Sequence, residues 1–212
     1  TKLRLWSELK LASFERTFTT LYALVFLALE TYIQLNLLGR RSYLVSLELQ
    51  AKRDAETPQR DAVHHIVLRG EDEATPPREQ DAYMAGRLSQ DTERKYLTSS
   101  YWFLHHGWKR VAETVHEAVR AELDDMPLRT IFTYPQLEEL VQRIRARIEG
   151  SAESDFAYAG GFRDILLPES EANEAAMLRS AGAVPQNMSD EETITPQLRG
   201  VLDETKDYID SP

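Results

Sequence analysis

Hydrophobic positions recur with a helical period along most of the chain. Leu11, Phe14 and Phe18 fall within about 60° of one another when successive residues are turned by 100°, so they form one stripe. The sequence contains no run of alternating β-branched residues and no Asn-Gly hairpin signal. The pattern therefore predicts an all-α fold, an elongated helical bundle with long helices.

The first predicted helix runs from near Thr1 to Leu38. Gly39 is expected to end it, because glycine suits the left-handed position that follows many helices. Ser42 would then cap a shorter helix that ends at Leu49.

Within the first helix, the run 21–29 is apolar on every side. A membrane-spanning helix needs about 20 such residues, and here Glu30 follows the run at once. An acidic side chain near a bilayer centre is costly. We therefore expect a core helix of a water-soluble bundle, surrounded by other helices.

The character of the chain changes between residues 50 and 89. This stretch is charged, contains Pro58, Pro76, Pro77 and Gly70, and has few large apolar residues. A connection of this length is either functional or disordered, and we favour disorder. The sequence thus predicts one helical domain over residues 1–212, with a disordered polar insertion at 50–89.

Capping and helix-ending residues mark the remaining helices. A second long helix is expected from Ser89 or Thr92 to about Leu123. The other boundaries come from similar signals: a capping box at Thr133 with Pro135 in the first turn, an end at Gly150, a cap at Ser170, an end at Gly182, and a start at Thr195-Pro196.

Composition narrows the possible functions. The 212 residues include 42% hydrophobic residues, enough for a real core, and no cysteine, which excludes disulfides and thiolate metal sites. The formal net charge of −10 argues against nucleic acid as the main partner, because phosphate binding requires a concentrated basic face.

The five histidines are the only lead toward an enzyme. His105, His106 and His116 fall on one helix, while His64 and His65 lie in the insertion. Metal ligands on a helix require a spacing of three or four residues, and neighbouring histidines point about 100° apart. No nucleophile elbow, phosphate loop or zinc-protease motif occurs. We expect no enzyme activity, no metal and no cofactor.

Polar and aromatic residues within the helices allow two interpretations each. Glu30, Gln34 and Asn36 could surround a ligand, or could be satisfied at helix contacts; we favour contacts for the first two. The aromatic run 96–108 could stack nucleic acid bases, but it lacks a basic groove, so core packing is favoured.

A second patch on the first helix has no assigned role. Lys2, Trp6 and Leu9 lie together on a face roughly 140° from the core stripe. Either another helix of the same domain covers this patch, or it is an exposed interaction site of the composition that dominates interface energies. The helical period alone does not decide between these two alternatives.

The quoted residues also resemble a known family. The segment "LWSELKLASFERTFTTLYALVFLALETYIQLNLLGRRSYL", and "QLNLLGR" within it, is similar to the peroxin-3 family of peroxisomal biogenesis factors. The similarity continues at "KYLTSSYWFLHHGWKRVAETVHEAVRAELDDMPL" and "LEELVQRIRARIE", and more weakly at "PQLRGVLDETKDYIDSP". The length of the insertion suggests a fungal member.

This resemblance implies a docking receptor for the chaperone peroxin-19, which delivers newly made membrane proteins. An amphipathic N-terminal helix of peroxin-19 would insert into a hydrophobic groove. The family's contact positions fall by motif on Lys2, Trp6 and Leu9, with Asn36 and Tyr43 as weaker candidates near an expected apical turn. The resemblance therefore favours exposure of the second patch.

The resemblance also implies a location and an alternative role. Members sit in the peroxisomal membrane through an anchor, expected upstream of this chain, and their helical domain faces the cytosol. The alternative is a structural tether that holds inheritance or autophagy factors on the peroxisome, with the 50–89 insertion or the acidic surface as the binding element.

Overall fold

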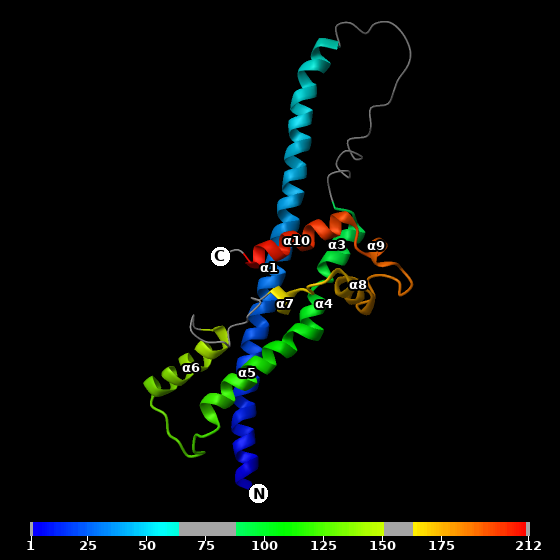
Figure 1. The fold of residues 1–212 in the computed structure, drawn as a ribbon. Helices are drawn as coiled ribbons and strands as arrows, with labels where there is room; N and C mark the ends of the chain where they lie inside the picture. Colours follow the sequence, from blue (N-terminus) through cyan, green and yellow to red (C-terminus); the bar gives the residue numbers. More distant parts are fainter. Residues whose placement is uncertain (1, 64–87, 151–162, 211–212) are drawn as a thin grey trace.

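The computed structural model describes residues 2–63, 88–150 and 163–210, and every regular element in these ranges is helical. The all-α prediction is confirmed (Figure 1). The helices are α1 (Lys2–Val63), α3 (Gln90–Leu97), α4 (Ser100–Trp102), the π-helical turn η1 (Phe103–Gly107), α5 (Trp108–Leu123), α6 (Tyr134–Glu149), α7 (Arg163–Leu166), α8 (Glu171–Ser180), α9 (Asp190–Thr193) and α10 (Pro196–Asp210).

Helix α1 is the axis of the molecule, and two core clusters are arranged along it (Figure 1). Leu11, Phe18 and Phe26 pack with buried residues of α5 and α6. Ile33 and Leu37 pack with buried residues of α3, α8 and α10. The predicted stripe of the first helix is therefore the core face, and it extends further than its first three members.

Helix α1 does not end at Gly39, so the predicted helix end was wrong. Helical structure continues without a break to Val63, and Gly39 does not adopt a positive φ. Leu37 and Val45, on either side of Gly39, are both buried. Arg41 also binds Glu204 of α10 at 2.8 Å. These contacts outweigh the cost of an interior glycine, about 1 kcal/mol, and the separate helix predicted from Ser42 is part of α1.

The expected insertion overlaps this extension. The range 50–63 is helical in the structure, whereas residues 64–87, which make up most of the 50–89 stretch, lie outside the described part of the chain.

The apolar run of α1 is not surrounded by helices, which corrects a second expectation. The side chains of Leu21, Leu24 and Val25 are 56%, 60% and 63% exposed, and so are many of their neighbours on the same side. Over the described ranges, one face of α1 is buried against the other helices and the rest of its surface is exposed. By length and composition α1 could cross a membrane, and only 28% of its most apolar window is buried.

The second long helix begins as predicted but is interrupted. Ser89 caps α3 by accepting a hydrogen bond from the Thr92 amide at 3.1 Å. The helix then breaks at residues 98–99 and resumes through α4, η1 and α5. The sequence pattern did not show this break, at which the Ser99 hydroxyl accepts a hydrogen bond from Gln34 of α1.

The π-helical turn η1 brings the backbone of Gly107 against α7. A β-carbon at this position would lie 2.1 Å from the Ile165 carbonyl oxygen and 2.9 Å from a ring carbon of Phe103. Only glycine fits this approach. The interruption therefore permits close packing of α7 on the helix that precedes α5.

The remaining predicted boundaries are confirmed. The Thr133 amide donates to the Gln136 side chain at 3.0 Å in the expected capping box. Gly150 and Gly182 end α6 and α8 with φ angles of 77° and 70°. The Ser170 and Thr195 hydroxyls accept hydrogen bonds from the amides of Asn173 and Leu198, each at 3.3 Å. Short helices α7 and α9 were not predicted.

Candidate partner-binding site

The first turns of α1 carry large apolar side chains that no described helix covers. Leu3, Trp6 and Leu9 are 75%, 61% and 54% exposed, and Lys2 is also exposed. Within the parts of the chain that the structure describes, no segment buries the Trp6 side chain. The patch of Lys2, Trp6 and Leu9 could have been covered by another helix or exposed, and within the described ranges it is exposed.

Lys10 links this end of α1 to the end of α5 and to the connection after it. The Lys10 ammonium donates to the carbonyl oxygens of Leu123 and Met126 at 2.7 and 2.8 Å. The Leu123 carbonyl belongs to the last residue of α5, where backbone acceptors lack helical partners and favour a positive charge, and the Met126 carbonyl belongs to the connection that follows. Lys10 therefore fixes the patch against the α5–α6 connection.

The α5–α6 connection adds apolar side chains that the sequence analysis missed. Met126 and Phe132 pack into the same core cluster as Leu11, so the connection runs beside the start of α1 (Figure 1). On and after this connection, Ile131 and Tyr134 are 91% and 79% exposed. No signal in the sequence shows that the connection folds back onto α1.

The exposed side chains at the start of α1 form the N-terminal surface, defined here as Lys2, Leu3, Trp6 and Leu9. It combines exposed aliphatic and aromatic groups with one cation. Aromatic residues within an apolar patch are typical of protein interfaces. A helix with an apolar face could cover such a surface.

Asn36 and Tyr43, the weaker candidates, lie far from this surface. Both are exposed, and the Asn36 amide donates to the Tyr32 carbonyl oxygen of its own helix at 2.8 Å. At 1.5 Å per residue along the unbroken α1, Asn36 is about 45 Å from Trp6 and Tyr43 about 55 Å. A 20-residue helix spans about 30 Å, so the structure does not bring these two residues into one site with Trp6.

The two buried polar residues of α1 differ from each other. The Gln34 amide donates to the Ser99 hydroxyl at 3.0 Å, as expected for a satisfied helix contact. Glu30 is 1% exposed, and neither carboxyl oxygen has a hydrogen-bond partner within the described ranges, so the same expectation was wrong for Glu30. Burial raises the pKa of Glu30 to about 8, so this group is protonated at neutral pH.

The aromatic run serves mainly the core. Tyr96 and Phe103 are fully buried, and the Tyr96 hydroxyl lies 2.8 Å from that of Thr205. Trp102 donates its indole N–H to the Asp164 carbonyl oxygen at 3.3 Å. Trp108 is the exception, because it is 42% exposed.

Of the three histidines that the structure describes, two stack on aromatic rings and one contacts a glutamate. His105 stacks on Tyr101 and His106 on Trp102, with ring centroids 3.8 and 4.6 Å apart. His116 pairs with Glu15 at 2.9 Å. Within the described ranges no three metal-ligating side chains gather; His64 and His65 lie outside them.

Comparison with known proteins gives the family. The family model for peroxin-3 matches residues 1–212. A peroxisomal biogenesis factor 3 from Yarrowia lipolytica is 31% identical over all of this chain and 48% of its own length, in agreement with the expected fungal origin. The human protein of the same name is 23% identical over all of the chain and 47% of its length. That of Saccharomyces cerevisiae is 25% identical over 84% of the chain and 42% of its length.

The chain thus spans about half the length of the curated relatives that it matches. No solved structure matches it significantly. Membership in this family implies association with peroxisomes and a role in their biogenesis, and peroxin-3 is not a known enzyme family. The whole chain, from residue 1 to residue 212, belongs to the peroxin-3 family.

Proposed function

We propose that this chain is the docking part of a receptor for the amphipathic N-terminal helix of the chaperone peroxin-19. By binding that helix, it recruits newly made membrane proteins to the peroxisome. The observation that carries the proposal is the exposure of Trp6 and Leu9 at an end of α1 that Lys10 holds in place.

The physical basis is the burial of two apolar faces against each other. Leucine or phenylalanine side chains at positions i, i+3 and i+7 of the partner helix would pack on Trp6 and Leu9. Leu3, which is 75% exposed one turn before Trp6, supplies further apolar area on α1. Lys2 would attract acidic residues of the partner and contribute to rate and specificity more than to affinity.

The membrane orientation is part of the same proposal: this helical domain faces the cytosol. The exposed ion pairs Arg143–Glu139 on α6 and Arg163–Asp210 between α7 and α10 support contact with water, and the cytosolic side is proposed from the family resemblance. Protease added to intact peroxisomes should then cleave the domain. Complete protection until detergent is added would contradict this orientation.

The tether alternative lacks comparable support. It relies on the 50–89 stretch, of which residues 64–87 lie outside the described part of the chain, or on the acidic surface, where no described feature points to an inheritance or autophagy factor. We therefore favour docking of peroxin-19 over the tether role.

Titration of a labelled peroxin-19 N-terminal peptide tests the proposed site. Trp6→Ala should weaken binding by about 30-fold or more, since truncation of a central interface tryptophan typically costs at least 2 kcal/mol. Tyr43→Ala removes an equally exposed aromatic side chain from the same helix and should leave the affinity within about twofold.

Thermal unfolding of both variants controls for misfolding, which is not expected because both side chains are mostly exposed. Equal affinities of the wild type and Trp6→Ala would reject the assignment of the site. A loss in Tyr43→Ala comparable to that in Trp6→Ala would also reject it.

A further inference from the structure

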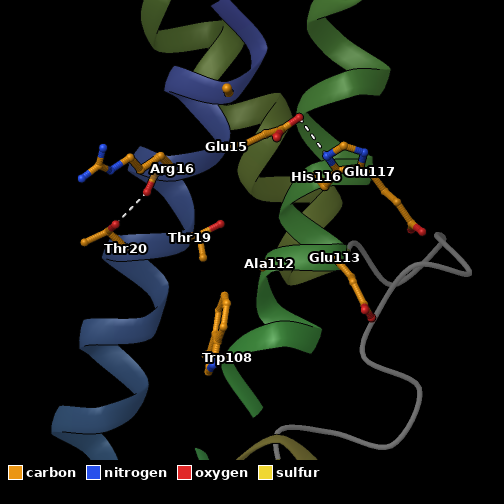
Figure 2. A pocket seen from close by; sticks show the side chains of 10 residues that line it. Glu15, Arg16, Thr19, Thr20, Trp108, Ala112, Glu113, His116 and Glu117 are labelled. Carbon is orange, nitrogen blue, oxygen red and sulfur yellow. Dashed lines mark hydrogen bonds and ion pairs between the residues drawn. The ribbon is translucent and has the colours of Figure 1, made fainter. Parts of the chain in front are cut away.

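A groove of about 560 Å³ lies between α1 and α5, one helical turn beyond Leu9 (Figure 2). Its inner lining includes Ala12 and Thr19 from α1 and Ala112 and Trp108 from α5. Figure 2 shows the Trp108 ring between the two helices. A half-exposed indole among small side chains gives a partner side chain an apolar surface to cover.

The rim of this groove is acidic. Glu113 and Glu117 extend from α5, one turn apart, and both are exposed (Figure 2). Neither has a hydrogen bond or ion pair among the residues that the structure describes. Two like charges at this spacing repel each other by a few tenths of a kcal/mol, so this pair does not contribute to the stability of α5.

The other charged groups of the lining do not cancel this rim. Glu15 is already paired with His116. Arg16 is the one guanidinium in the lining, and Figure 2 shows its side chain directed away from α5. Glu113 and Glu117 extend from the side of α5 that faces away from α1, so they give the groove a negative outer edge on α5 (Figure 2).

We propose that this groove binds a basic amphipathic helix of a partner protein. Apolar residues of that helix would cover Trp108 and Ala112, and its lysine or arginine residues would lie against Glu113 and Glu117. The charge is opposite to that expected of a helix drawn to Lys2 on the N-terminal surface, so this is a second docking surface. Nucleic acid and anionic lipid are disfavoured, because their phosphates would meet carboxylates.

Two designed helical peptides test the proposal on the full-length protein. Both carry leucines at positions i, i+3, i+4 and i+7; one has lysines on its polar face and the other glutamates. Fluorescence anisotropy at low ionic strength should show binding of the leucine–lysine peptide. The double variant Glu113→Gln/Glu117→Gln should weaken this binding roughly three- to tenfold, as expected for two rim charge pairs.

A matched double variant separates the groove from net charge. Glu138→Gln/Asp207→Asn removes two exposed carboxylates outside the groove and should leave the affinity unchanged. An equal loss in both double variants would overturn the proposal, since overall charge would then explain the binding. Absence of leucine–lysine binding would overturn it as well, and would fit a groove covered by another part of the same protein.

The test of the groove can be distinguished from the test of the proposed peroxin-19 site. Trp6→Ala should leave leucine–lysine binding intact, and Glu113→Gln/Glu117→Gln should leave binding of the peroxin-19 peptide intact. A loss of leucine–lysine binding in Trp6→Ala would show that the peptide binds the N-terminal surface, contrary to the proposal.

Discussion

Glu30 is an acidic residue in a buried environment that does not suit a charged carboxylate. It lies on the buried side of α1 and interacts electrostatically with Tyr96 of α3, yet its carboxyl group has no hydrogen-bond partner in the described ranges. Desolvation disfavours the charged form and raises its pKa from 4.5 to about 8. In the unfolded chain the same group ionises near its ordinary pKa.

This difference makes stability depend on pH. Between about pH 4.5 and pH 8 the folded state keeps a proton that the unfolded state releases, so the free energy of unfolding falls as pH rises. The contribution of Glu30 between pH 5 and pH 7 is on the order of 2–3 kcal/mol. Glu30→Met removes the titrating group at similar size and should be more stable than wild type at pH 7.

Urea unfolding at pH 5, 7 and 8.5 measures this effect. The difference in unfolding free energy between Glu30→Met and wild type should grow with pH and level off above pH 8, while other carboxylates cancel in the comparison. A constant difference across the three pH values would show that Glu30 is not held as a buried neutral acid.

At the scale of elements, the continuity of α1 through Gly39 is the feature that sets the distance between its surfaces. Gly39 has helical geometry and open space around its α-carbon. Gly39→Ala should therefore raise the free energy of unfolding by about 0.5–1 kcal/mol, because alanine favours the helix. If Gly39 instead ended the helix in a left-handed conformation, alanine would destabilise the protein by about 1–2 kcal/mol.

Gly107→Ala is the matched control in the same unfolding experiment. Its β-carbon would overlap the Ile165 carbonyl oxygen of α7, so overpacking should destabilise the protein by about 1–3 kcal/mol. Opposite signs for the two substitutions are the expected result, and stabilisation by both would contradict the close contact at η1.

Local signals predicted the elements whose ends depend on neighbouring residues. Thr133, Ser170 and Thr195 begin helices because their own side chains satisfy nearby amides. At the break, Ser99 accepts a hydrogen bond from Gln34, and beyond Gly39 the side chain of Arg41 binds Glu204 of α10. Such contacts join segments far apart in sequence, so periodicity and capping could not show them.

Across the whole molecule, α1 is packed on one side and open on the other. The exposed side carries the N-terminal surface at one end, the apolar residues Leu21, Leu24 and Val25 further along, and Tyr43 beyond them. Turning successive residues by 100° was enough to separate the Trp6 face from the core stripe, because the positions of both on α1 follow from the helical period. It did not show that Met126 and Phe132 pack into the same core cluster as Leu11, since their position depends on the path of the α5–α6 connection.

Fluorine NMR of the protein labelled with 5-fluorotryptophan tests the central claim most directly. The chain has three tryptophans, and Trp6→Phe identifies the Trp6 resonance. Addition of the peroxin-19 N-terminal peptide should shift the Trp6 resonance and leave those of Trp102 and Trp108 in place. An unchanged Trp6 signal under saturating peptide, with or without a shift elsewhere, would contradict the account.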